Sequence, residues 1–218
     1  AEVTVSKIFP AGFGWQAASV QAGAMGYEAN SLGFFMITGA GDFAGVLAGH
    51  TLFMAGKKAA GFDVDMRAQA ETGFLLGSAA FCSGFTWQPT LNALQELGLS
   101  FNQSVTGVGA ACALAFFGGL RMFRTVYSPF MGGVEEPTYQ NLKADAGLSV
   151  AIGGATGCFV GTDVTFGDNW LRGVVGIEEG TSDMAGQVIA GSSTALGFMA
   201  TQAVQNVTMT KGKCWLDQ

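Results

Sequence analysis

Long hydrophobic stretches without charge recur along this 218-residue chain. No Asp, Glu, Lys or Arg occurs between Glu71 and Glu96 or between Glu96 and Arg121, and two further charge-free windows follow. A helix needs about 20 residues to cross a bilayer, and these windows match that length. The pattern predicts an all-α polytopic membrane protein with about five transmembrane helices. The expected spans are residues 32–56, 72–95, 102–120, 146–163 and 184–207.

The remaining segments divide the chain into three parts. Residues 1–30 are expected to form an N-terminal interfacial segment, because Pro10 and Gly12 interrupt the apolar run and weaken it as a helix. A sixth span over residues 8–27 is the alternative. Residues 31–210 are then a single transmembrane helical domain, and residues 211–218 are a C-terminal tail.

The basic residues give an independent indication of a membrane and of its orientation. With five spans, eight of the ten lysines and arginines fall in alternate connectors, as the positive-inside rule expects. This sorting puts the N-terminus outside and the C-terminus inside. The start of the chain, Ala1-Glu2-Val3, resembles a terminus left by a processing protease. We therefore expect an integral protein of an organellar inner membrane or a thylakoid membrane, with the C-terminus in the matrix or stroma.

Composition narrows the function classes. Charged residues make up 12% of the chain, about half of the share usual in globular proteins. The net charge of −6 argues against nucleic acid as a partner. The four cysteines form no CxxC pair, so they predict neither a metal site nor a disulfide framework. They are Cys82, Cys112, Cys158 and Cys214.

Two ladders of glycines indicate how the helices pack. Each ladder places three glycines four residues apart, so that they share one stripe of a helix. Such stripes let two helix backbones approach closely in a membrane. The predicted helix-packing residues are Gly41, Gly45, Gly49, Gly153, Gly157 and Gly161.

The second and fifth predicted spans contain the same four residue types at a constant separation of 114 positions, as from Gly77 to Gly191. The first and fourth spans also match, either at 112 positions or at 116. Two pairs of spans flanking a single span would form a 2+1+2 inverted repeat, a design typical of transporters. Chance resemblance between glycine-rich helices is the alternative.

Polar residues inside the predicted spans are candidates for an intramembrane site. Asp42 is costly within a span, which indicates either a function or a buried partner. His50, the only histidine, lies two turns further on the same face and is a candidate ligand or interfacial hydrogen-bonding group. Four amides occupy matching places in the second and fifth spans and could line a site or join helices. They are Gln88, Asn92, Gln202 and Asn206.

The sequence lacks a Ser/His/Asp arrangement and a phosphate-binding loop, so we expect no enzyme, no catalytic residues and no metal. The glycine-striped spans resemble those of small multi-pass subunits of organellar inner-membrane complexes. The leading hypothesis is therefore a non-catalytic accessory subunit of such a complex, which contacts other membrane subunits or copies of itself and could hold lipid or pigment. A small-solute or proton transporter with an inverted repeat is the second hypothesis, and a soluble self-assembling shell protein is the third.

Overall fold

The computed structural model describes residues 2–127, 139–162 and 183–211. These residues are helical apart from short connectors, and they form no strand. A π-helical turn, η1 (Thr4–Ile8), leads directly into the first α-helix. The α-helices are α1 (Phe9–Ala24), α2 (Leu32–Ala59), α3 (Met66–Glu96), α4 (Phe101–Tyr127), α5 (Tyr139–Thr162) and α7 (Asp183–Lys211). The predicted all-α class is thus confirmed. Four of the five predicted spans lie within one helix, and the span 146–163 lies in α5 up to Thr162, where the described part of that helix ends.

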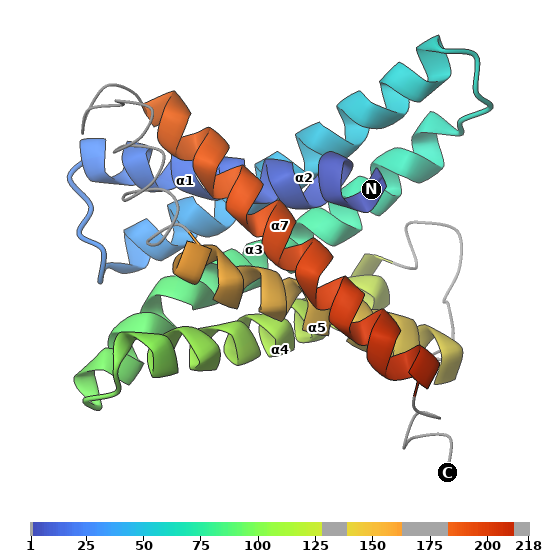
Figure 1. Ribbon diagram of the computed structural model, residues 1–218. Helices are drawn as coiled ribbons and strands as arrows, with labels where there is room; N and C mark the ends of the chain where they lie inside the picture. Colours follow the sequence, from blue (N-terminus) through green and yellow to red (C-terminus); the bar gives the residue numbers. More distant parts are fainter. Residues whose placement is uncertain (1, 128–138, 163–182, 212–218) are drawn as a thin grey trace.

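The helices pack as a closed ring. Each helix contacts the next in the chain, and α7 returns to contact α1. The helices run alternately back and forth between two ends of the bundle (Figure 1). An ion pair between Lys57 and Glu2, at 3.3 Å, joins the start of the chain to the end of α2. Because the helices alternate in direction, the N-terminal end of η1 and the C-terminal end of α7 lie at the same end of the bundle (Figure 1).

We call this end the basic end, because the described lysines and arginines all lie toward it. They are Lys7, Lys57, Lys58, Arg67, Arg121, Arg124, Lys143 and Lys211. The connectors 25–31 and 97–100, which carry no basic residue, lie together at the opposite end (Figure 1). The ends of the bundle are therefore unlike in charge.

Residues expected at an interface belong to the ring. Pro10 does not break the helix: it lies directly after the π-helical turn η1, and the helix continues through it into α1. Gly12 packs against Thr194 of α7, and Gly14 packs against Gly41 of α2. The glycines that weaken α1 as an isolated helix therefore allow it to approach both of its neighbours.

Local signals set the boundaries of α2 and α3. The Ser31 hydroxyl accepts a hydrogen bond from the N–H of Phe34, and the Asp65 carboxylate accepts from the N–H of Arg67 and of Ala68. Gly61 follows α2 with a φ of 89°, a left-handed conformation that favours glycine. The sequence alone thus contains the start and stop signals of these helices.

Two helix crossings in the ring are built alike. At each crossing, one glycine of the first helix faces two glycines of the second helix. A Cβ added to the first glycine would overlap the carbonyl oxygen of one of them and approach the Cα atom of the other. The two sets are Gly14 with Gly41 and Gly45, and Gly109 with Gly153 and Gly157. The α1 and α4 members differ by 95 positions, from 14 to 109, and the α2 and α5 members by 112, from 41 to 153. Of the two registers that the sequence allowed for α2 and α5, the contacts match 112. The α1–α2 crossing thus resembles the α4–α5 crossing, and the 2+1+2 inverted repeat stays a prediction from the sequence.

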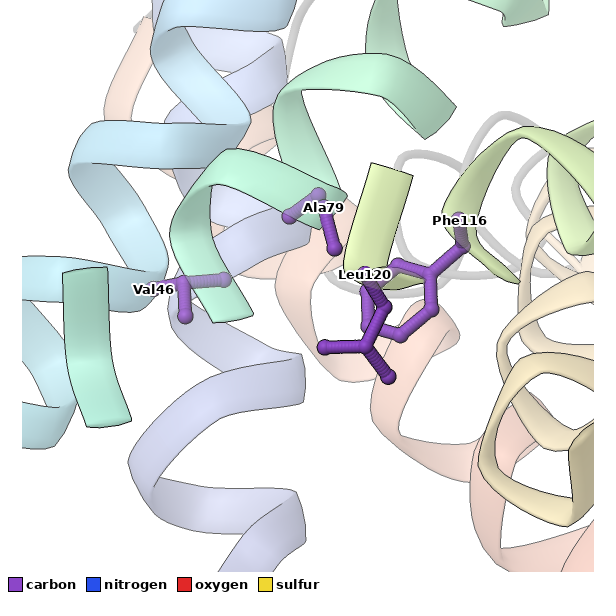
Figure 2. Close-up of a cluster of buried hydrophobic side chains, with 5 residues drawn as sticks. Val46, Ala79, Phe116 and Leu120 are labelled. Atoms are coloured by element: carbon purple, nitrogen blue, oxygen red, sulfur yellow. The ribbon is translucent and has the colours of Figure 1, made fainter. Parts of the chain in front are cut away.

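The apolar core lies inside the ring. Val46 of α2 and Ala79 of α3 belong to one buried cluster with Phe116 and Leu120 of α4 (Figure 2). Leu148 and Ile152 of α5 pack against the same cluster, so it bridges successive helices of the ring.

Two helices are long and apolar enough to cross a membrane, within Leu32–Ala59 and Gln103–Tyr127. The predicted five spans are therefore not confirmed by length and composition. The physical reason is that α3, α5 and α7 are rich in glycine, serine, threonine and amide side chains, which lower their mean hydropathy. Only 22% and 39% of the most apolar windows of the two candidates is buried, whereas the core helix of a soluble protein is mostly buried.

Candidate functional site

A cavity of about 140 Å³ lies within the ring of helices and is lined by η1 and all six described α-helices. Its wall is predominantly apolar, and it includes Val46, Ala80 and Phe116 of the core cluster. The polar side chains in the wall are Lys7, Trp15, Asp42, Ser83, Trp87, Thr156 and Thr194.

The cavity is elongated along the bundle. Lys7 of η1 and Leu148 of α5 line it on the side of the basic end. Trp15 and Thr156 lie eight residues further along the same continuous helices, a rise of about 12 Å. The cavity therefore extends along the bundle from the side of the basic end to the two tryptophans at its far side.

Two tryptophans form that far side. The rings of Trp15 and Trp87 meet edge to face, with centroids 5.0 Å apart. Both rings pack against a buried pair, Val105 of α4 and Ala190 of α7. Four helices thus contribute to the apolar packing around these two rings.

Among the described residues, Asp42 is the only carboxylate in the cavity wall. It faces α3, and a Cβ added at Gly84 would overlap its Oδ2 atom, so the absence of a side chain at Gly84 makes room for the carboxyl group. In the described part of the chain, no hydrogen bond or ion pair reaches this carboxyl group. The Asp42 oxygens are not fully buried, so a small molecule in the cavity can reach them.

Ser83 and Trp87 bring two more polar groups to the same wall. The Ser83 hydroxyl and the Trp87 indole N–H are buried, and within the described residues neither has a hydrogen-bond partner. Cys112 of α4 donates a hydrogen bond through its thiol to the Ser83 carbonyl oxygen, at 3.4 Å, which ties this part of α3 to α4. Such unpaired buried groups are unusual and indicate either an occupant or a functional role.

His50 lies outside the cavity. Its imidazole is buried against Gly73 of α3, and Gln69 lies alongside it. Neither ring nitrogen reaches hydrogen-bond geometry with a described residue. Asp42 and His50 both face α3, as their spacing indicated, but only Asp42 lines the cavity.

The four amides do not form one site. Gln88 donates a hydrogen bond to Asn92, which donates to the Ala29 carbonyl oxygen at the end opposite the basic end. Gln202 and Asn206 lie near the other end of the bundle and are exposed. The repeated spacing of these residues therefore does not bring them together.

The predicted packing glycines lie at helix crossings inside the chain. Gly41 and Gly45 pack against α1, and Gly49 packs against Pro10 and Ser6. Gly153 packs closely against Gly109 of α4, with Gly157 beside it. The contacts of Gly161 and Cys158 lie outside the described side chains, and Cys214 lies outside the described residues.

Sequence reasoning missed the aromatic and hydroxyl members of the wall. Trp15 belongs to the segment 1–30, which the sequence placed at the membrane interface. Ser83 and Trp87 carry no local signal that separates them from other residues of an apolar helix. Gly84 could have indicated where the Asp42 carboxyl group lies, because a glycine on a neighbouring helix makes room for such a group. This inference requires knowing that α2 packs against α3, which the sequence does not show. Among the described residues, no three His, Cys, Asp or Glu side chains converge as a metal site would require.

Comparison with known proteins adds no family to this picture. No family model, no curated protein and no solved structure matches the chain.

Proposed function

We propose that the protein is an integral membrane protein whose helix ring binds a small solute and moves it, or a proton, across the bilayer. The observation that carries the proposal is the cavity within the ring, with an accessible and unpaired carboxylate in an apolar wall. In membrane proteins, ionisable groups that face the interior of a bundle commonly mark solute or proton paths.

The distribution of polar side chains supports the membrane part of the proposal. Leu52, Leu114 and Leu196 are 72%, 74% and 57% exposed, whereas hydroxyl residues are buried between the helices. The buried Thr38 and Thr194 hydroxyls each donate a hydrogen bond to the carbonyl oxygen four residues earlier. Such bonds satisfy a hydroxyl where no water is available. Large apolar side chains on the outer surface and small polar side chains between the helices are the arrangement expected for a protein surrounded by lipid.

The charges support the same arrangement. The described basic residues lie toward one end of the bundle, which is the sorting expected for the cytoplasmic, matrix or stromal side. Asp145 pairs with Arg121 and Arg124 at this end, at 3.1 and 3.2 Å, so the charged contacts of α4 and α5 lie away from the middle of the helices.

Flux measurements on reconstituted protein test the proposal. Purified protein is placed in liposomes that contain a pH-sensitive dye, and salts and neutral solutes are applied in turn while volume and internal pH are recorded. Wild-type protein is expected to accelerate at least one of these fluxes. Asp42→Asn is expected to abolish the acceleration, because it removes the carboxylate that the described residues place in the wall. Glu96→Gln, an exposed carboxyl at the end of α3, is the control and is expected to keep it.

Equal fluxes through wild-type and Asp42→Asn protein would contradict the proposed role of Asp42. Liposomes with wild-type protein that match empty liposomes for every solute would contradict transport altogether.

A non-catalytic subunit of a larger membrane complex is the second candidate, and the size of the cavity favours it. At about 140 Å³, the cavity is smaller than the roughly 300–1,000 Å³ of typical ligand pockets. Co-purification of the protein in mild detergent with stoichiometric partners, together with absent flux, would favour this candidate. The organellar location stays a prediction from the sequence.

A further inference from the structure

We propose that the cavity binds a small organic monocation of about six non-hydrogen atoms, paired with the Asp42 carboxylate. The proposal rests on the proposed function for its biological role, but the site itself is argued from the geometry of the cavity. It names the chemical class of solute that this wall can recognise.

The volume limits the size of the occupant. A dry protein cavity of about 150 Å³ accommodates benzene, which has six non-hydrogen atoms. The cavity here, at about 140 Å³, is of the same size. An occupant of five or six non-hydrogen atoms would fill it, whereas a drug-sized molecule could not enter without a rearrangement of the helices.

The charge of the wall selects a cation. Asp42 brings a carboxylate whose oxygens are accessible and have no described partner. Lys7, the other ionisable group in the wall, lies toward the basic end, where the Glu2 carboxylate acts on it. No charge of the described chain therefore compensates Asp42 directly, and burial of an unpaired carboxylate is costly. Without a bound cation, the carboxyl group avoids this cost by holding a proton, so a cation that binds here pairs with the carboxylate and displaces that proton.

The rest of the wall selects an organic cation over a metal ion. Metal cations such as Ca²⁺ and Mg²⁺ need six or more oxygen ligands, often including water. The described residues supply one carboxylate and no convergent group of metal-ligating side chains. The aromatic rings of Trp15, Trp87 and Phe116 instead provide apolar surface and electron-rich faces, which suit an alkylammonium ion.

Gly84 fixes the position of the carboxylate. A side chain at this position would overlap the Asp42 Oδ2 atom. Gly84→Ala is therefore expected to displace the carboxylate while keeping its charge in the protein. This variant separates the effect of carboxylate position from the effect of charge.

Calorimetric titration of the purified full chain in detergent tests the site. The probes are n-butylammonium, its uncharged analogue 1-butanol, and K⁺. We expect saturable binding of n-butylammonium alone. Asp42→Asn is expected to weaken this binding at least about 30-fold, as for truncation of one member of a buried charge pair. Gly84→Ala should also weaken it, and Glu96→Gln should leave it unchanged.

Equal affinity for 1-butanol and n-butylammonium, with no effect of Asp42→Asn, would overturn the proposal and leave an apolar void. Binding of K⁺ as tight as that of n-butylammonium would also overturn it. If wild-type protein has no measurable affinity for n-butylammonium while flux is observed in liposomes, this inference fails and the proposed function stands. If n-butylammonium binds but no flux is observed in liposomes, this inference stands and the proposed transport function fails.

Discussion

Asp145 joins α5 to α4 through two arginines. Its Oδ2 atom lies 3.1 Å from the Nη1 atom of Arg121, and its Oδ1 atom lies 3.2 Å from the Nη2 atom of Arg124. Asp145 is 4% exposed, whereas the two arginine side chains remain partly accessible. At the scale of single residues this is the most buried ionic contact in the described chain, and it contrasts with the exposed pair of Lys57 and Glu2.

Asp145→Asn is expected to lower the free energy of unfolding by at least about 2 kcal/mol, because it leaves two guanidinium groups facing a buried neutral side chain. The measurement is equilibrium unfolding in mixed detergent micelles. Glu2→Gln breaks the exposed pair with Lys57 and should change the free energy by less than about 1 kcal/mol. Equal losses in the two variants would show that burial of the Asp145 contact contributes nothing.

Close helix crossings depend on glycine at particular positions. In α2, a Cβ at Gly45 would overlap the carbonyl oxygen of Pro10 on α1, whereas a Cβ at Gly56 would meet nothing within 4 Å. One helix therefore contains both a glycine that packing requires and a glycine that packing does not use. Substituting each glycine by alanine therefore separates the effect of a helix–helix contact from the effect of helix propensity.

Gly45→Ala is expected to destabilise the protein by about 1–3 kcal/mol, since the added methyl group forces α1 and α2 apart. Gly56→Ala should instead be neutral or stabilising by up to about 1 kcal/mol, because alanine favours the helix. Gly153→Ala should behave like Gly45→Ala, because a Cβ there would overlap the Gly109 carbonyl oxygen. Thermal unfolding of the three variants in one detergent compares them. A loss for Gly56→Ala as large as that for Gly45→Ala would contradict the crossing geometry.

The whole molecule closes because α1 contributes a sixth helix. With α1 in the ring, the start of the chain lies beside the end of α2, and the C-terminal end of α7 lies at the same end of the bundle (Figure 1). Five spans would place the two termini on opposite sides of a membrane, and six place them on the same side. The chain therefore offers a direct test of its arrangement in a bilayer.

Epitope tags added at both termini are expected to be digested together by protease applied to one side of sealed vesicles, and protected together from the other side. A third tag inserted in connector 60–65 should behave like them, and a fourth in connector 25–31 should show the opposite protection. Carbonate extraction is the control, since an integral protein stays in the pellet. Opposite protection of the two termini would contradict membrane insertion of all six helices.

The sequence by itself predicted five of the six described α-helices, and it did not predict α1 as part of the ring. Charge-free windows, capping residues such as Ser31 and Asp65, and a glycine such as Gly61 act within a few residues, so they can be identified without knowledge of the fold. Glycine spacing also predicted packing stripes, because helical periodicity is local, and Gly41, Gly45 and Gly153 of those stripes lie against a neighbouring helix. The tertiary structure alone decided which helix meets each stripe, and that Asp42 faces a cavity while His50 does not. It also separated Gln88 from Gln202, whose matching positions suggested a shared site. The physical reason is that a helix face is fixed by neighbouring residues, whereas its partner is fixed by the path of the whole chain around the ring.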